Sequence, residues 1–248
     1  MKIKQIIKKI WKSVMSVLLK IYTNNYELYI QNIPIDNTKE KYYSQFGQDI
    51  FVLKNIFKDK KDGFFVDVGA NHPTVGSNTY LLELNGWNGI AIEPQQSLRE
   101  LWPSTRKTKC LNYVVGPENK EVTFVEGNEN EHGLSGVEGF NKCSNECKKI
   151  SVQQKKLTDI LSENSITNVD YLSIDVEGYE MNVLKSIDFS KINIKLIGLE
   201  NDLGFKNIPI IGKKLGSELD NNDLRNFLKE RGYEFIARIV CDDFFIKK

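Results

Sequence analysis

The stretch FFVDVGANHP, residues 64–73, decides the fold of this chain of 248 residues. Its apolar run ends at Asp67 and Gly69, a pattern typical of a short buried strand that leads into a tight turn. Gly69 lets the backbone turn sharply and lets a ligand approach it closely. A dinucleotide site would carry G-x-G-x-x-G, but Asn71 and Pro73 occupy the space that a pyrophosphate needs. The turn therefore favours a nucleoside ligand without pyrophosphate over a nicotinamide cofactor.

Outward from this stretch, short apolar strands alternate with helices. We predict strands at 90–94, 111–115, 171–175 and 195–200, and helices at 77–87, 96–102, 157–164, 179–187 and 221–231. Two extra strands, 122–125 and 150–152, flank a glycine-rich loop, and a hairpin of 234–240 with 243–247 closes the chain. This order predicts an α/β, Rossmann-like fold with a mostly parallel sheet and helices on both faces. Such sheets bind ligands in a crevice at the carboxyl ends of their strands.

The second strand ends at Glu93, which Pro94 follows. A carboxylate at this strand end is placed to accept hydrogen bonds from both hydroxyls of a ribose. The alternative for Asp67 and Glu93 alike is that each carboxylate only caps a loop. Because both acids stand at strand ends in this order, we favour the ligand-binding interpretation.

Three further residues are candidates for the chemical step. Asp175 and Glu177 end the strand 171–175, where they either orient and deprotonate a substrate hydroxyl or only stabilise the next helix at its N-terminus. His72 lies in the turn after the first strand, and its imidazole either acts as a base near pH 7 or is a hydrogen-bonded turn residue. All three remain alternatives for the base.

The N-terminal residues 1–41 differ from the rest of the chain. Apolar positions recur with the helical period over residues 1–21, and this stretch carries lysines at 2, 4, 8, 9, 12 and 20 and no acid. The lysines interrupt the apolar run too often for a membrane-spanning helix. The helix either packs on protein or lies on an anionic membrane surface. We expect a basic helix with its linker over 1–41 and one domain over 42–248.

Composition argues against two other kinds of protein. The net charge of +1 carries no signature of nucleic-acid binding. The four cysteines, Cys110, Cys143, Cys147 and Cys241, form no C-x-x-C pair, and one isolated histidine, His132, lies near them. We therefore predict no metal site, and we expect reduced thiols in a cytoplasmic protein.

Several separated blocks of this sequence resemble the FkbM-type methyltransferase family. They are SQFGQD (44–49), FVDVGANHP (65–73), SNTYLLE (77–83), GWNGIAIEP (86–94) and YLSIDVEGYEMNVLKSIDF (171–189). The resemblance spans about residues 42–247. It implies a class I methyltransferase fold with seven core strands, the last antiparallel, and methyl transfer from S-adenosylmethionine, typically to a hydroxyl oxygen.

Carried onto this sequence, the resemblance implies a role for each candidate residue. The cofactor-binding residues would be Asp67, Gly69, Ala70, Asn71, Glu93 and Pro94, with the turn after the first strand at the amino-acid part and Glu93 at the ribose. Asp175 and Glu177 would face the transfer site. We expect the acceptor to be a sugar hydroxyl of a surface glycan or its precursor. The alternatives are a non-sugar small molecule, such as a natural product or a lipid, and a non-catalytic nucleoside-binding protein of the same fold.

Overall fold

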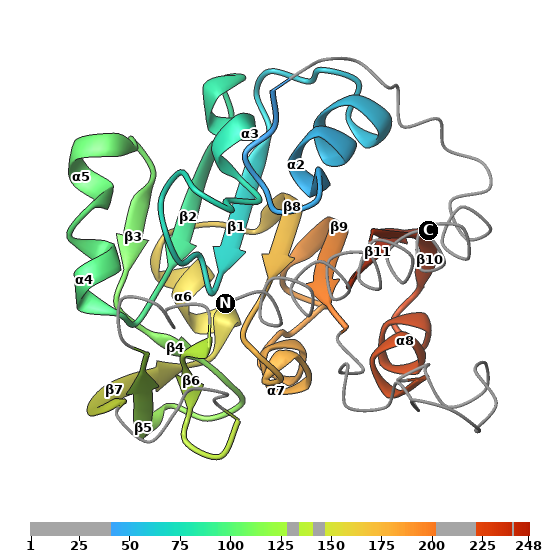
Figure 1. Cartoon of the computed structure of the whole chain (residues 1–248). Coiled ribbons are helices and arrows are strands. Elements are labelled where there is room, and N and C mark those ends of the chain that lie inside the picture. Colours follow the sequence, from blue (N-terminus) through green and yellow to red (C-terminus); the bar gives the residue numbers. More distant parts are fainter. Residues whose placement is uncertain (1–40, 128–133, 141–146, 202–221, 240) are drawn as a thin grey trace, which may run out of the picture. The chain divides into compact units, whose positions relative to one another are not determined.

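A seven-stranded sheet forms the centre of the fold (Figure 1). The computed structural model describes residues 41–127, 134–140, 147–201, 222–239 and 241–248. The strands of this sheet are β1 (Phe64–Val68), β2 (Asn88–Ile92), β3 (Lys109–Leu111), β8 (Asn168–Ile174), β9 (Asn193–Glu200), β10 (Tyr233–Ile239) and β11 (Asp242–Lys247). They lie in the order β10-β11-β9-β8-β1-β2-β3, so the chain order reverses between β1 and β8. Ligand crevices form at such a switch point.

The central sheet is mixed rather than purely parallel. All neighbouring strands from β3 to β9 are parallel, whereas β11 runs antiparallel to both β9 and β10. A short hairpin links β10 to β11, and strands joined in that way must be antiparallel. The prediction of a mostly parallel sheet with an antiparallel last strand agrees with this arrangement.

Three helices cover one face of the central sheet. They are α6 (Leu157–Glu163), α7 (Glu180–Lys185) and α8 (Asn222–Lys229). Their Leu157, Leu184 and Leu228 are fully buried in one hydrophobic core together with Val66 and Val68 of β1. Because side chains alternate along a strand, the neighbouring Phe65 must point to the other face.

The opposite face is covered by helices from the first half of the chain. They are α2 (Gln48–Ile50), the π-helical turn η1 (Phe51–Ile56), α3 (Tyr80–Leu84), α4 (Gln96–Arg99) and α5 (Trp102–Thr105). Trp102 packs against Ala70 and Ala91, and Phe51 meets Phe244 of β11 edge to face. The prediction of helices on both faces is confirmed.

A second sheet lies beyond the carboxyl ends of β1 and β2 (Figure 1). It contains β4 (Val114–Val115), β5 (Lys120–Glu126), β6 (Gly136–Val137) and β7 (Lys148–Lys155), in the order β4-β7-β5-β6. The prediction of one strand over 111–115 is therefore wrong. Leu111 ends β3 in the central sheet, and Val114 begins β4 in the second sheet. Both residues are buried, so the apolar pattern gives no sign that the chain passes from one sheet to the other here.

Helix boundaries also differ from the predictions. The predicted helix 96–102 is divided into α4 and α5, because Pro103 in the first turn of α5 has no N–H to continue a helix. The predicted helix 77–87 begins only at Tyr80, whose N–H donates to Ser77 Oγ at 3.2 Å.

The basic helix predicted within residues 1–21 lies outside the described residues, as do His132 and Cys143. All the described residues belong to one compact unit, which begins at Thr38. Among the helices in the described ranges, none is long and apolar enough to cross a membrane.

Candidate active site

A cavity of about 480 Å³ lies where β1, β2 and β8 end, next to the second sheet. Its polar lining residues are Gln45, Asn71, Glu93, Gln95, Ser135, Asp175 and Glu177, and its apolar ones include Val68, Tyr113, Val115, Phe124, Leu134 and Val137. Most of the polar groups follow strands of the central sheet, whereas Phe124 and Val137 belong to the second sheet. This volume is in the range of small-molecule sites, and apolar walls with a few polar groups are typical of them.

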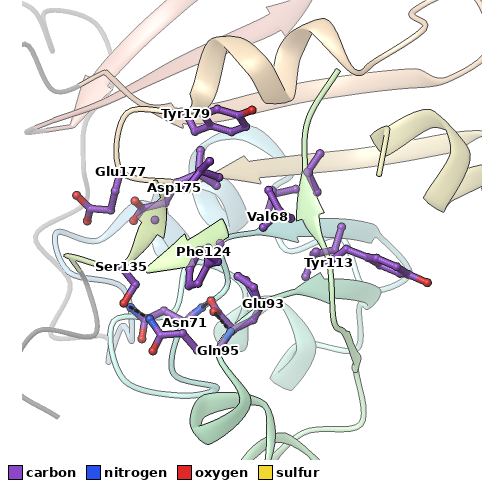
Figure 2. Close-up of a pocket in the computed structure, with 18 of the residues that line it drawn as sticks. Val68, Asn71, Glu93, Gln95, Tyr113, Phe124, Ser135, Asp175, Glu177 and Tyr179 are labelled. Atoms are coloured by element: carbon purple, nitrogen blue, oxygen red, sulfur yellow. Dashed lines mark hydrogen bonds between the residues drawn. The ribbon is translucent and has the colours of Figure 1, made fainter. Parts of the chain in front are cut away.

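Glu93 is held by the backbone on one side of this cavity (Figure 2). Its Oε2 accepts the N–H of Asn71 at 2.8 Å, and its Oε1 accepts the N–H of Gln95 at 2.8 Å. The residue is only 4% exposed, and this burial raises the pKa of Glu93 to about 7, although the two N–H groups lower it. A carboxylate has about four acceptor positions, so Glu93 can still accept hydroxyl donors from a ligand.

The turn after β1 touches the end of β8. Gly69 has a φ of 78°, and a Cβ on it would lie 1.8 Å from the carbonyl oxygen of Asp175. Only glycine allows these two backbones to meet so closely. A smaller cavity of about 80 Å³ adjoins the turn and shares Gln45, Gly69, Asn71 and Asp175 with the larger one.

Asp67 lines this smaller cavity. Thr79 donates its hydroxyl to Asp67 Oδ2 at 2.6 Å, and burial raises the pKa of the Asp67 carboxyl above its usual value. Arg106 donates to Thr79 Oγ1 at 3.2 Å. The hydroxyl of Thr79 and the positive charge of Arg106 both stabilise the charged form of Asp67. The acid at the end of the first strand is thus a cavity residue with a fixed orientation.

Three carboxylates gather at the ends of β8 and β9. One oxygen each of Asp175, Glu177 and Glu200 lies within 4.8 Å of the others. Burial raises the pKa of Asp175 well above its usual value, and the charges of Glu200, Asp242 and Glu177 raise it further. Carboxylate oxygens are ligands of divalent cations. The prediction that no metal binds stays a prediction.

Backbone strain also marks this cavity. Asn71 and Glu177 have φ values of 49° and 56°, in the left-handed region that favours glycine. Asparagine enters this region more readily than glutamate does, so Glu177 is the more unusual of the two. Residues held in this way are found disproportionately at functional sites.

A comparison with known protein families connects this site to a reaction. The family model described as "Methyltransferase FkbM domain" matches residues 67–235, more than half of the chain. The chain belongs to the FkbM methyltransferase family. A search of curated proteins finds no match to it. The FkbM match includes all the candidate site residues predicted from the sequence, and it leaves out the block at 44–49.

Two of the three remaining candidates of this FkbM methyltransferase line one of these cavities, and His72 does not. Pro94 lines the larger cavity and Ala70 the smaller one. His72 lines neither of these two cavities, and its Nδ1 accepts the N–H of Thr74 at 3.2 Å and of Val75 at 3.1 Å. Its role as a base stays a prediction, and the geometry favours the turn interpretation.

Four residues of this site were missed by the sequence analysis. Gln45 comes from the loop before α2, Glu200 from the end of β9, and Gln95 and Ser135 join the central sheet to the second sheet through a side-chain hydrogen bond. The block SQFGQD drew attention to Gln45, but the sequence analysis assigned no function to its residues. Glu200 ends a predicted strand just as Asp175 does, so its position was a usable signal.

Proposed function

We propose that this methyltransferase transfers the methyl group of S-adenosylmethionine to a sugar hydroxyl of a surface glycan or its precursor. The observation that carries the proposal is Glu93, a buried carboxylate held by two backbone N–H groups beside a cavity at the switch point of the sheet. A ribose offers two neighbouring hydroxyl donors to such a group. The apolar wall of the larger cavity suits a nucleobase, and the polar smaller cavity suits an amino-acid group.

The residues present fit the donor in this way. Glu93, with Pro94 beside it, would hold the ribose, and the turn of Asp67, Gly69 and Asn71, with Ala70, would hold the amino-acid part. When bound, S-adenosylmethionine supplies a methyl group that its sulfonium already activates. The protein then has to align the acceptor oxygen, and good alignment accounts for roughly 7–11 kcal/mol of a barrier.

Asp175 and Glu177 would orient the acceptor hydroxyl and take its proton. A carboxylate within reach of the hydroxyl can act as its general base. Burial and the charges of neighbouring carboxylates raise the pKa of Asp175 well above its usual value, which makes it a stronger base than an exposed aspartate. The proton would pass from the hydroxyl to a carboxylate oxygen of one of these two residues. His72 is the weaker candidate because its Nδ1 already accepts two backbone N–H groups.

Acceptor class and location are further parts of the proposal. A hydroxyl acceptor suits a site with carboxylate acceptors and no basic side chain among the described residues that line it. A small molecule such as a natural product or a lipid is the alternative acceptor. We place the enzyme in the cytoplasm, in peripheral contact with an anionic membrane through residues 1–21.

Thermal unfolding with S-adenosylhomocysteine or NAD tests the cofactor. A ligand at about 100 times its dissociation constant adds about 2.7 kcal/mol of stability, which raises the midpoint by several degrees. We expect this shift with the sulfur nucleoside and not with NAD. No shift at millimolar S-adenosylhomocysteine would overturn the proposal.

A second experiment tests the acceptor. The protein is incubated with S-adenosylmethionine and with nucleotide sugars or extracted glycan precursors, and mass spectrometry detects methylated products. Methylation of only non-sugar compounds would overturn the sugar assignment.

A further inference from the structure

The segment Ser44–Asp49, the SQFGQD block, forms a frame held by its own polar groups. Asp49 is fully buried, and its Oδ1 accepts the hydroxyl of Ser44 at 2.6 Å while its Oδ2 accepts the N–H of Tyr43 at 2.7 Å. Ser44 Oγ in turn accepts the N–H of Gly47 at 3.1 Å. Gly47 has a φ of 86°, which the sharp turn before α2 requires. Local hydrogen bonds thus fix the shape of this frame.

Two anchors fix where the frame lies. Gln48 donates its Nε2 to Asp242 Oδ2 at 2.6 Å, and both side chains are buried. Ser44 pairs with Gly76 in an isolated parallel bridge. The frame is therefore joined to β11 on one side and to the loop that follows β1 on the other.

Gln45 is the residue that this frame presents to the cavities. It lines both the larger and the smaller cavity, and its Cγ lies 3.6 Å from where a Cβ on Gly76 would be. Ser44, Gln48 and Asp49 use their side chains inside the frame or in its anchors. By contrast, no hydrogen bond joins the amide of Gln45 to another residue of the described ranges.

Among the described residues, the lining of the smaller cavity has the chemistry of a site for a zwitterion and includes no basic side chain. The polar residues among them are two carboxylates, Asp67 and Asp175, and three amides, Gln45, Asn71 and Asn78. An α-ammonium group can be matched by the carboxylates. An α-carboxylate must then be matched by neutral N–H donors, and Asn78 Nδ2 already donates to Ser173 Oγ at 3.3 Å.

We propose that Gln45 is a cofactor-positioning residue, whose side-chain amide donates to the α-carboxylate of the amino-acid part of S-adenosylmethionine. This inference rests on the proposed function. It extends the cofactor site to an element that lies before β1 and outside the residues matched by the family model. The frame of Ser44–Asp49 holds this donor in place before the ligand arrives, which lowers the entropic cost of binding.

Two nucleosides show whether Gln45 acts on the amino-acid part of the cofactor or on the rest of it. S-adenosylhomocysteine carries the amino-acid part, and 5′-deoxy-5′-methylthioadenosine lacks it. Affinities of the full chain and its variants are measured by calorimetry for both. We expect Gln45→Ala to weaken S-adenosylhomocysteine about 3- to 10-fold, the usual effect of one lost hydrogen bond, and to leave methylthioadenosine unchanged. Gln45→Glu should weaken S-adenosylhomocysteine more, because it places a negative charge beside the carboxylate.

Gln153→Ala is the matched control, because Gln153 is an exposed glutamine on β7 outside both cavities. It should change neither affinity, and the unfolding midpoints of all the variants report on folding. Equal weakening of both nucleosides by Gln45→Ala, or of neither, would overturn the role of Gln45. If the unsubstituted protein binds neither nucleoside, the proposed function itself fails, and this inference fails with it.

Discussion

Glu93 combines two tendencies that oppose each other. Burial disfavours its charge and raises its pKa to about 7, whereas the N–H groups of Gln95 and Asn71 favour the carboxylate. A ribose donates hydroxyl protons, so it binds the charged form. In the proposed cofactor site, the protonation state of this one residue would couple cofactor affinity to pH near neutrality.

We expect the affinity for S-adenosylhomocysteine to fall about tenfold from pH 8 to pH 6, because the free protein takes up a proton on Glu93 that binding must release. The sign follows from a carboxylate that is mostly charged above its pKa of about 7 and mostly neutral below it. Glu93→Gln should bind more weakly at pH 8 and lose most of this pH dependence. Calorimetry at both values checks the prediction, and an unchanged pH dependence in Glu93→Gln would contradict it.

Two independent constraints require glycine at position 69: its positive φ and the close approach of the backbone of Asp175. Gly69→Ala should lower the free energy of unfolding by more than about 3 kcal/mol, because its Cβ would overlap the carbonyl oxygen of Asp175 at 1.8 Å. Gly232→Ala is the control: Gly232 has a similar φ of 82°, but nothing lies within 4 Å of its Cβ position. There we expect a loss of about 1 kcal/mol. Equal losses in urea denaturation would show that contact with Asp175 is unimportant.

At the scale of elements, a chain of hydrogen bonds joins the Glu93 side of the cavity to the second sheet. Gln95 donates its N–H to Glu93 and its Nε2 to Ser135 Oγ, which also accepts the N–H of Gly127 at 2.8 Å. Figure 2 shows Asn71, Glu93, Gln95 and Ser135 as one group, apart from Asp175, Glu177 and Tyr179. Across the cavity, Tyr179 donates its hydroxyl to Gln154 Oε1 of β7 at 3.0 Å. The second sheet is thus attached on both sides of the cavity.

The contact between Gln95 and Ser135 can be measured by a double-mutant cycle. Gln95→Met keeps the length of the side chain and the N–H that binds Glu93, and it removes only the amide. We expect Gln95→Met and Ser135→Ala to cost about 1–2 kcal/mol each, and the double variant to cost less than their sum by about 0.5–1.5 kcal/mol.

Amide exchange over residues 134–137 should be faster in both single variants. Gln96→Met, at an exposed neighbouring glutamine, is the control and should stay within about 0.5 kcal/mol of the unsubstituted protein. Additive costs would mean that the two residues act separately.

At the scale of the whole molecule, we expect the fold and the basic N-terminal sequence to have separate tasks. Both sheets and both cavities belong to the unit that begins at Thr38. The lysines of residues 1–21 carry the proposed membrane contact, which depends on charge rather than on the fold. A protein shortened to residues 38–248 should therefore bind S-adenosylhomocysteine as tightly as the full chain does.

We expect the full chain to sediment with phosphatidylserine vesicles, and the shortened protein to stay in solution. Each lysine near an anionic surface contributes about 1 kcal/mol, and salt should weaken the binding. Phosphatidylcholine vesicles are the control. Failure of the full chain to bind would favour the alternative that the predicted helix packs on protein, and equal sedimentation of both proteins would show that residues 1–37 are not needed for membrane binding.

Local patterns in the sequence determined most of the strands and helices of the central sheet, the turn at Gly69 and the strand-end acids, but not α2, η1 or β6. Hydrophobic period, turn glycines and a carboxylate after a strand are properties of neighbouring residues, so they can be predicted without knowing the packing. The same patterns predicted the fold class, and the blocks together indicated the family that the comparison confirmed.

Only the tertiary structure decided which distant residues meet. The run 111–115 is divided between two sheets, Gln45 reaches both cavities from the frame of residues 44–49, and Glu200 joins Asp175 from the next strand. Glu200 meets Asp175 because the crossover between β8 and β9 brings the ends of two parallel strands to one edge of the sheet. A burial pattern says that a residue is inside, whereas its partners depend on the packing of the complete chain.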